Sequence, residues 1–548
     1  MKYNPSLIKE ITLDGKSLVF EEFIAAARFG AHVNIDPAAI ERMKESRALA
    51  EKIQAEGRAA YGITTGFGEF QNTAVAPEMS NQLSTNLILS HCTATGEPYK
   101  EEVARGIMIL RCNNLLVGIS GVRPLLVEIM VEMLNKGVTP VIPQKGSLGS
   151  SGDLAPLAHM TLPILGLGEA TYKGEVLPGG EAMKRAGIQT VDTLVCKEGL
   201  GMTNGTCAMT SCGALALYDA ICAAEMADVI ASMSMEGLTC QRNAFDPRVH
   251  TCRGHEGQIK VAENLRMLTE DSPLIDKAQG DRVQDAYALR CTPQILGAVR
   301  DSLQFVMDKV DIELNAVTDN PLLFIEDEAV ISGGNFHGEP MALPFDLLGI
   351  AAAEIADLSE RRLERMVNPA LSNGLTPFLV TEAGLNSGFM IVQYAAASMV
   401  SESKIYAHPA SVDSIPSSAN QEDIVSMGTT AARTARMIVE NTLDVLALEL
   451  LTACQAIDIR RRAGTHGDKI SDFHQKIYDK VREEVDFYEI DREIWPDIRA
   501  MERFIRRKDL LDIIDIYKPE LLENNAWGRH RKDMKFTPQV KPKDGSSI

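Results

Sequence analysis

The stretch GSLGSSGDLAPL, residues 146–157, contains three consecutive small residues, Ser150, Ser151 and Gly152. Because glycine has no Cβ, its amide nitrogen can approach the carbonyl carbon two residues earlier in the chain. Formation of that bond with loss of water closes a five-membered ring, and loss of a second water from the central serine leaves an exocyclic methylene. The chain could therefore make its own electrophile, to which a substrate amine can add.

Sequence motifs for the common cofactors are missing. There is no P-loop, and GLGMTN at 199–204 departs from the dinucleotide fingerprint at its last position. No His or Cys spacing is typical of a zinc site, and the two serines do not lie in a G-x-S-x-G elbow. We therefore expect no metal, and the reactive group would have to come from the chain itself.

The composition restricts the class of protein. A net charge of −20 over 548 residues argues against a nucleic-acid partner, which would need a clustered basic face. The N-terminus has the character of neither a signal peptide nor a membrane span, and the longest apolar segments carry polar or charged residues. The ten cysteines form no C-x-x-C pair. We expect a cytoplasmic protein with reduced thiols and no contact with membranes.

The pattern of apolar residues predicts a mainly α fold built on a long central helical bundle. Residues 11–28 indicate a short strand, a turn at Asp14-Gly15 and an amphipathic helix, and 169–176 is one of few other extended segments. Apolar residues at helical spacing occupy 103–135, 206–235, 296–314, 343–367, 387–407 and 425–459. Several of these segments are apolar on nearly all sides, which is typical of helices buried among other helices.

We divide the chain into four regions. An N-terminal region (1–200) precedes a long-helix bundle (201–465), and RRRAGTHGDK at 460–469 marks the change to a more charged helical segment (466–528). The last part, 529–548, is basic and contains Pro, Gly and Ser, which predicts a disordered tail.

Five loops between the predicted helices are unusually rich in Gly, Asn, Ser and Thr. Their sequences are YGITTGFGEF (61–70), KGSLGSSGDLAPL (145–157), EGLGMTNGT (198–206), SGGNFHGEP (332–340) and SIPSSANQED (414–423). Polar loops on a rigid apolar scaffold are where binding and catalytic residues concentrate. We expect these five loops to form the functional site.

GSLGSSGDLAPLAH resembles the signature of the aromatic amino-acid ammonia-lyase and aminomutase family, and the similarity extends from about residue 8 to about residue 460. The resemblance implies the fold of the ammonia-lyase/fumarase-like superfamily. It also implies a 4-methylidene-imidazol-5-one group (MIO) formed autocatalytically from Ser150, Ser151 and Gly152, with Asp153 beside them. Ser150 stands where most members have Ala. Because the ring uses only the backbone of that position, we expect it to close; the alternative is an uncyclised loop.

The resemblance assigns roles around this group. Tyr61 corresponds to the catalytic base on a mobile lid loop, and a phenol must be tuned by its surroundings to act near neutral pH. Arg290 corresponds to the residue that holds the substrate carboxylate, for which a guanidinium fork is suited. Gln284 and Tyr287 precede it by six and three residues, so on a helix the three would share a face along the substrate pocket.

Three further matches concern the walls of that pocket. By the same resemblance Asn204 lies beside the prosthetic group, and Asn335 and Phe336 form another wall. For His337 a structural role and a direct role both stay open. Ser90 and His91 lie where the family selects the side-chain ring of its substrate.

The identity of the substrate depends on polar residues near that ring. A Ser90-His91 pair resembles histidine-specific members, although tyrosine aminomutases carry it too, and an unpaired polar group would cost roughly 1–3 kcal/mol. Glu422 resembles the histidine-specific form of its loop, where a carboxylate can accept from an imidazole N–H and assist proton transfer. Ile424 and Thr64 depart from that form, which typically has His and Asn at these places.

We therefore predict elimination of ammonia from L-histidine to give trans-urocanate. Alternatives are a tyrosine or phenylalanine lyase, a 2,3-aminomutase, a lyase for a histidine derivative, or a non-catalytic relative. The family also implies a homotetramer whose sites draw loops from three subunits. The nearly all-round apolar helices at 343–367 and 387–407 fit this, because a lone subunit would expose them.

Overall fold

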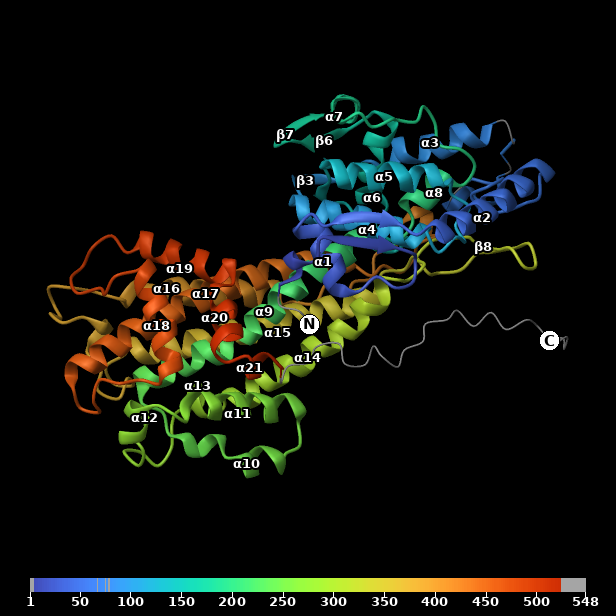
Figure 1. Ribbon diagram of the computed structural model, residues 1–548. Helices are drawn as coiled ribbons and strands as arrows, with labels where there is room; N and C mark the ends of the chain where they lie inside the picture. Colours follow the sequence, from blue (N-terminus) through green and yellow to red (C-terminus); the bar gives the residue numbers. More distant parts are fainter. Residues whose placement is uncertain (1–3, 67, 74, 77–78, 524–548) are drawn as a thin grey trace.

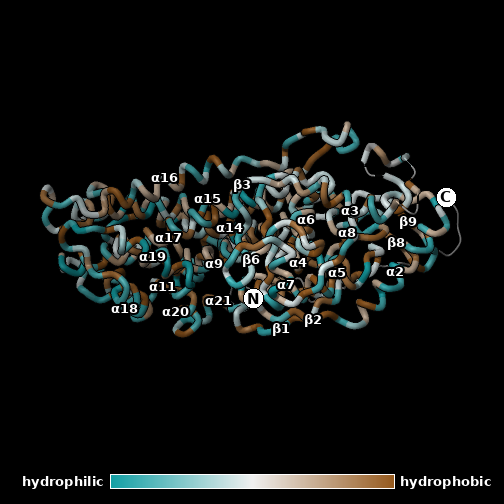
Figure 2. Tube along the Cα trace, turned by 90° about the horizontal axis from the view of Figure 1, so that it is seen from above, coloured by the Kyte–Doolittle hydropathy of each residue, from teal (hydrophilic) through white to brown (hydrophobic). Residues whose placement is uncertain are grey.

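Long helices packed side by side give the molecule an elongated shape (Figures 1 and 2). The computed structural model describes residues 4–66, 68–73, 75–76 and 79–523, so the predicted tail at 529–548 lies outside the described residues. The bundle helices are α9 (Cys207–Leu238), α11 (Glu256–Thr269), α14 (Thr292–Glu313), α15 (Glu339–Val367), α16 (Met390–Tyr406) and α17 (Gly428–Ala463). The predicted mainly α class and long bundle are confirmed.

The helix α9 is the centre of the bundle. It packs against α17, α15, α14 and α11 of the bundle and against α4 of the N-terminal region. Every residue of α9 except Asp219 is buried, as expected for a helix that is apolar on nearly all sides. Asp219 pairs with Arg28 across the boundary between the two regions.

The N-terminal region covers one end of the bundle with short helices and small sheets (Figure 1). Its helices are α1 (Phe20–Arg28), α2 (Pro37–Glu56), α3 (Ser80–His91), α4 (Glu101–Leu115), α5 (Pro124–Lys136), α6 (Leu154–Thr161), α7 (Gly179–Ala186) and α8 (Glu198–Thr203). Its strands are β1 (Glu10–Leu13), β2 (His32–Ile35), β3 (Thr95–Pro98), β4 (Val138–Pro140), β5 (Pro143–Lys145), β6 (Glu169–Tyr172) and β7 (Glu175–Pro178). The predicted strand, turn and helix at 11–28 and the extended segment at 169–176 are confirmed.

These strands form small sheets that do not make a core of their own. β1 and β2 pair in parallel with Ile11 opposite Val33, and β3 pairs with β5 in antiparallel fashion. β4, β6 and β7 form a three-stranded antiparallel sheet. Most of the buried apolar side chains of these elements belong to the same hydrophobic core as those of the bundle.

The segment at 103–135, which has apolar residues at helical spacing, contains two helices. α4 ends at Leu115 and α5 begins at Pro124. Between them Gly118 and Gly121 have φ values of +83° and +69°, and a Cβ on Gly118 would lie 2.8 Å from the backbone carbon of Arg42. The chain must therefore turn here to let the N-terminal helices pack closely, which the apolar spacing alone did not indicate.

Short elements complete the fold around the long helices. They are α10 (Pro247–Thr251), α12 (Pro273–Lys277), α13 (Tyr287–Arg290), the antiparallel hairpin of β8 (Leu322–Phe324) and β9 (Ala329–Ile331), and the C-terminal helices α18 (Asp472–Glu484), α19 (Trp495–Arg507), α20 (Asp509–Tyr517) and α21 (Glu520–Glu523). α17 ends at Ala463, and α19 returns to pack against it. Among the described helices, none is both long and apolar enough to cross a bilayer.

Three bundle helices begin close to the small-residue loop at 146–153. The amides of Gly338 and Met427, which immediately precede α15 and α17, donate to carbonyls of this loop, and the first turn of α9 donates to Asp153. The rigid bundle thus places this loop, and with it the loops that connect these helices.

Candidate active site

The small-residue loop is held by hydrogen bonds from distant parts of the chain. The carbonyl of Leu148 accepts from the amide of Met427 at 2.9 Å. The carbonyl of Gly149 accepts from the amide of Gly338 at 2.9 Å and from the hydroxyl of Ser426 at 3.0 Å. The loop therefore has a single position relative to the starts of α15 and α17.

Asp153 ties the loop to the central helix. Its carboxylate is fully buried; Oδ2 accepts from the amides of Ala208 (2.8 Å) and Met209 (2.9 Å) in the first turn of α9. Oδ1 accepts from the hydroxyls of Ser147 (2.8 Å) and Thr429. Burial raises the pKa of Asp153 above its ordinary value, and these hydrogen bonds offset the rise only in part. The N-terminus of a helix also favours negative charge.

Gly152 approaches the backbone of Gly205 more closely than any other residue could. The amide of Asp153 donates to the carbonyl of Gly205 at 2.7 Å, and a Cβ on Gly152 would lie 2.3 Å from that carbonyl oxygen. Gly152 has a φ of +78°, which L-residues with a side chain rarely adopt. A Cβ on Gly205 would in turn meet the hydroxyl of Thr318 at 2.5 Å. The tight contact therefore requires glycine at both positions.

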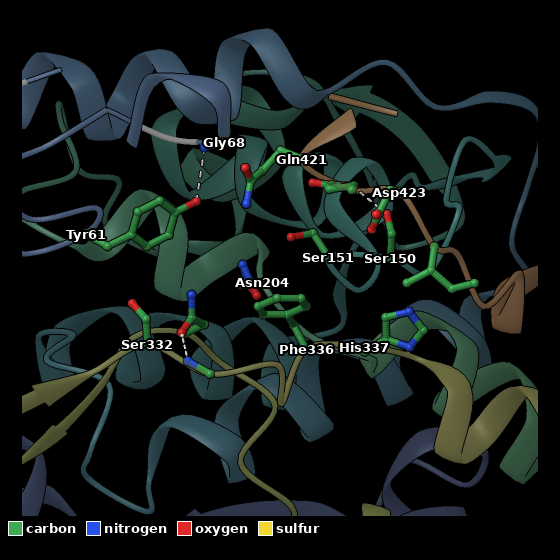
Figure 3. A pocket seen from close by; sticks show the side chains of 14 residues that line it. Tyr61, Gly68, Ser150, Ser151, Asn204, Ser332, Phe336, His337, Gln421 and Asp423 are labelled. Carbon is green, nitrogen blue, oxygen red and sulfur yellow. Dashed lines mark hydrogen bonds between the residues drawn. The ribbon is translucent and has the colours of Figure 1, made fainter. Parts of the chain in front are cut away.

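A cavity of about 400 Å³ opens beside this contact (Figure 3). In Figure 3 the side chains of Ser151 and Asn204 point into the space between Tyr61 and Phe336. The lining residues are Tyr61, Gly68, Ser150, Ser151, Asn204, Asn320, Ser332, Gly333, Phe336, His337, Gln421, Glu422, Asp423 and Ile424. The structure thus brings together residues from all five polar loops that were singled out in the sequence.

Asn204 has an unused acceptor in this cavity. The residue is 2% exposed, its carbonyl accepts from Arg111 at 2.7 Å, and its side-chain Oδ1 is buried without a hydrogen-bond partner among the described residues. An unpaired buried acceptor is costly, so such an atom is expected to meet a ligand or a prosthetic group. The close contact at Gly152 fits a ring formed from Ser150, Ser151 and Gly152. Because such a ring carries only acceptors, it would accept from the side-chain amide of Asn204 and leave Oδ1 for a donor of a ligand.

Tyr61 lies on the opposite wall of the cavity. Its phenol oxygen accepts from the amide of Gly68 at 3.1 Å. Burial raises the pKa of Tyr61 above its ordinary value and the charge of Glu422 adds to the rise, while the bond from Gly68 opposes it. Thr64 does not face the cavity: its hydroxyl donates to the carbonyl of Arg58 at 2.8 Å and accepts from the amide of Ala60. Thr64, which departs from the family pattern, therefore stabilises the backbone of its own loop.

Glu422 lies between the main cavity and a smaller one of about 210 Å³. Ser90 and His91 line the smaller cavity, and Ser150 and Glu422 line both. His91 Nδ1 is 2.9 Å from the hydroxyl of Ser90. Burial lowers the pKa of His91, and the charge of Glu422 opposes this shift. The predicted ring-selecting residues thus share one region with the small-residue loop.

Gln284, Tyr287 and Arg290 lie far from this cavity in the same chain. α14 starts at Thr292, two residues after Arg290, and runs for 22 residues, about 33 Å, before Glu313 reaches the hydroxyl of Thr206 near the site. Figure 1 accordingly shows α13 well separated from α6 and α8.

These three residues also differ from the predicted helical face. α13 contains only Tyr287–Arg290, so Gln284 precedes the helix and does not share a face with the other two. The buried carboxylate of Asp285, which accepts from the amide of Gln241 and from Arg282, holds this segment in a loop. The guanidinium of Arg290 lies over the ring of Tyr287, 4.6 Å from its centroid.

Asn335 and His337 occupy the wall between the main cavity and another of about 420 Å³. Asn335 lines only that second cavity, and its amide donates to the carbonyl of Val317 at 3.3 Å. His337 lines both cavities. Its Nδ1 accepts from the amide of Glu339 at 3.3 Å, and its buried Nε2 has no partner among the described residues. This arrangement assigns the proton of the neutral ring to Nε2.

Several lining residues were not identified from the sequence. Gln421 and Asp423 flank Glu422 in one of the five polar loops. Their position next to Glu422 was the sequence feature that could have identified them as lining residues. Asn320 precedes β8 outside the five polar loops, and its side chain accepts from the amide of Gly333 at 2.7 Å. Only the long-range packing of that segment reveals its place in the site.

Comparison with known proteins identifies relatives that share this fold. In the solved structures, histidine ammonia-lyase from Trypanosoma cruzi has a TM-score of 0.86 and 39% identity, over 94% of this chain and 96% of that one. Tyrosine aminomutase from Streptomyces globisporus has a TM-score of 0.87 and 36% identity, over 92% and 98%. The shared fold is therefore that of ammonia-lyases and aminomutases.

The sequence comparisons define the family more narrowly. Histidine ammonia-lyase 1 of Fusobacterium nucleatum is 51% identical over 508 residues, which are 93% of this chain and 98% of that protein. The family model described as aromatic amino acid lyase matches residues 18–483. The chain belongs to the aromatic amino acid lyase family, which confirms the family predicted from the sequence.

The role of Asp153 as an anchor predicts a large loss of stability on its replacement. In Asp153→Ala the backbone amides of Ala208 and Met209 lose their side-chain acceptor inside the protein, so the free energy of unfolding should fall by about 3 kcal/mol. Ser147→Ala, which removes one of the four donors, should cost only about 1 kcal/mol. Urea unfolding followed by circular dichroism measures both; an Asp153→Ala protein as stable as Ser147→Ala would contradict the assignment.

Proposed function

We propose that this chain is a histidine ammonia-lyase, a carbon–nitrogen lyase that converts L-histidine to trans-urocanate and ammonia. The observation that carries the proposal is the position of Glu422, which lies at the junction of the cavity containing Ser151 and the cavity containing His91. A carboxylate there can accept from an imidazole N–H. The relatives that are 51% identical and are named histidine ammonia-lyases support the same substrate.

The proposed prosthetic group is MIO formed from Ser150, Ser151 and Gly152. When formed, it supplies an electrophile that makes the amine of the substrate a better leaving group. The side-chain amide of Asn204 would donate to the carbonyl oxygen of this ring, which leaves its unpaired Oδ1 for a donor of the substrate, and Asp153 holds the loop in which the ring lies. Residues 150 to 152 therefore serve as both backbone and cofactor in this proposal.

The remaining side chains of the proposed site bind the substrate or transfer its proton. Tyr61, as the phenolate, takes the β-proton; the electron pair of that C–H bond forms the Cα–Cβ double bond, and the C–N bond breaks to release ammonia. His91 and Glu422 bind the imidazole, and Phe336 is an apolar wall beside it. Arg290 binds the substrate carboxylate.

For Arg290 to do so, it must come from another subunit. Within one chain the length of α14, about 33 Å, separates it from the site. The helix α16 supplies a second argument, because Ile391, Tyr394 and Ile405 are 59%, 59% and 70% exposed on a single chain. Apolar patches of this kind are typical of subunit interfaces. We therefore propose a homotetramer in which Gln284, Tyr287 and Arg290 complete the site of a neighbouring subunit.

The free state of the cysteines supports a proposal for the cellular compartment. All ten are free thiols, seven of them buried. This usage fits a reducing environment, so we propose that the enzyme works in the cytoplasm.

The substrate is tested by ultraviolet absorbance of the purified protein with L-histidine, L-tyrosine and L-phenylalanine in parallel. Growth of the urocanate band with histidine alone is the expected result. A cinnamate or coumarate band would contradict the assignment of Glu422 and His91. Tyr61→Phe should lose at least about 100-fold in kcat, the usual contribution of a general base; equal rates would refute its role.

The likeness to tyrosine aminomutase favours one second candidate, migration of the amine to Cβ. The two reactions share the binding residues but differ in the product. NMR spectra of the same reaction mixtures should contain no β-amino acid. A β-amino acid product would replace the lyase by a 2,3-aminomutase.

Subunit sharing is tested by complementation between two inactive variants. Tyr61→Phe and Arg290→Met each inactivate every site of their own homotetramer. Because Tyr61 and Arg290 of one site would belong to different chains, co-expression should produce mixed tetramers that contain some intact sites and regain a measurable part of the wild-type activity. Two variants of the same cavity, Tyr61→Phe and Glu422→Gln, are tested in the same way for comparison. The second pair should recover no activity. Equal recovery in both pairs, no recovery in either pair, or a monomer by light scattering would contradict the proposal.

The raised pKa of Tyr61 predicts how the rate depends on pH. Below that pKa, the phenolate fraction, and with it kcat/KM, rises about tenfold per pH unit. Glu422→Gln removes a negative charge that raises the pKa of Tyr61, so the rise in kcat/KM should shift to lower pH. The substrate's own amine titrates identically with both enzymes, so a difference between their profiles belongs to the protein. Coincident normalised profiles would contradict this prediction.

A further inference from the structure

We propose that the hydroxyl of Ser150 orients the Glu422 carboxylate toward the imidazole of the substrate. Ser150 would thereby be a positioning residue that sets specificity, in addition to supplying backbone for the ring. The inference rests on the proposed function, because it assigns the way in which Glu422 binds histidine.

The contact between the two side chains is short and half-buried. The hydroxyl of Ser150 donates to Glu422 Oε2 at 2.5 Å, and Ser150 is 5% exposed. Hydrogen bonds from a hydroxyl to a charged carboxylate are among the strong ones. This contact therefore has the strength needed to hold the Glu422 side chain in one rotamer.

The hydrogen bonds to the Glu422 carboxylate involve only one of its two oxygens. The hydroxyl of Ser417 also lies near Oε2, at 3.4 Å, so both serine hydroxyls approach the same oxygen. The other oxygen, Oε1, accepts no hydrogen bond from any residue that the structure describes. With Oε2 occupied, the carboxylate presents Oε1 for a donor from the substrate. An imidazole N–H is such a donor, whereas a phenyl ring has none.

The hydroxyl of Ser150 remains available after ring closure. The ring would form from the carbonyl carbon of residue 150 and the amide nitrogen of Gly152, and the second water is lost from the side chain of Ser151. No atom of the Ser150 side chain takes part. The Cβ and Oγ of Ser150 would therefore stay next to the ring, and the hydroxyl would join the prosthetic group to the substrate-binding carboxylate.

The position of the pair explains why this bond matters for specificity. Ser150 and Glu422 both line the cavity with Tyr61 and Asn204, and both line the cavity with Ser90 and His91. A rotation of Glu422 would change the two cavities together. The hydrogen bond between Ser150 and Glu422 thus fixes the boundary between the cavity for the reacting part of the substrate and the cavity for its ring.

Ser150→Ala removes the hydroxyl and keeps the backbone that the ring needs. We expect the peptide still to lack two waters by mass spectrometry, and kcat/KM for L-histidine to fall about fivefold, mainly through KM. Ser150→Thr, which restores a hydroxyl, should regain most of the loss. In the Glu422→Ala background, which has no acceptor for the hydroxyl, Ser150→Ala should have no further effect of this size, because the two residues act through one contact.

Binding without the prosthetic group gives an independent measurement. Ser151→Ala cannot form the methylene, so calorimetric titration with trans-urocanate reports the pocket alone. The dissociation constant should rise about fivefold from Ser151→Ala to Ser150→Ala/Ser151→Ala. This readout does not depend on turnover.

Three results would overturn the inference: an unchanged KM in Ser150→Ala, an equal loss in the Glu422→Ala background, or a Ser150→Ala chain that retains both waters. In the last case the hydroxyl would serve ring closure and not Glu422. A wild-type enzyme that releases no urocanate from histidine would instead refute the proposed function itself.

Discussion

The buried carboxylate of Asp153 is the interaction on which the arrangement of the site depends. It joins a loop of the N-terminal region to the first turn of α9, and Thr429 adds the start of α17 to the same contact. The cost of burying a charge appears in the raised pKa of Asp153 and is offset in part by four donors. Because Asp153 follows Gly152 directly, this anchor also brings Gly152 against Gly205.

A single chain holds the reacting end of the proposed site but not its carboxylate-binding end. Tyr61, Ser151, Asn204 and Glu422 share one cavity, whereas Arg290 lies at the far end of α14. The same chain leaves an apolar face of α16 exposed. Association of subunits along the bundle would resolve both features at once, since it would cover α16 and bring another chain's Arg290 toward the cavity.

Local chemistry made much of the fold and of the candidate site predictable. α9 could be predicted because its residues are apolar on nearly every side, and the loop at 146–153 because no helix or strand favours Ser-Ser-Gly. What failed depends on contacts between distant segments. The turn at Gly118 exists because the backbone of Arg42 approaches it, and the loop at Gln284 because Asp285 bonds to Gln241. Asn320 reaches the cavity only through the packing of β8, so no local pattern could place it there.

The most direct measurement of the central claim is the mass of the proteolytic peptide that contains residues 150–152 of the native enzyme. If the chain makes its own electrophile, this peptide is lighter by two waters than its sequence requires, and the matching peptide of Ser151→Ala shows no second loss. A wild-type peptide of full mass, from a protein that is folded and active, would contradict the account.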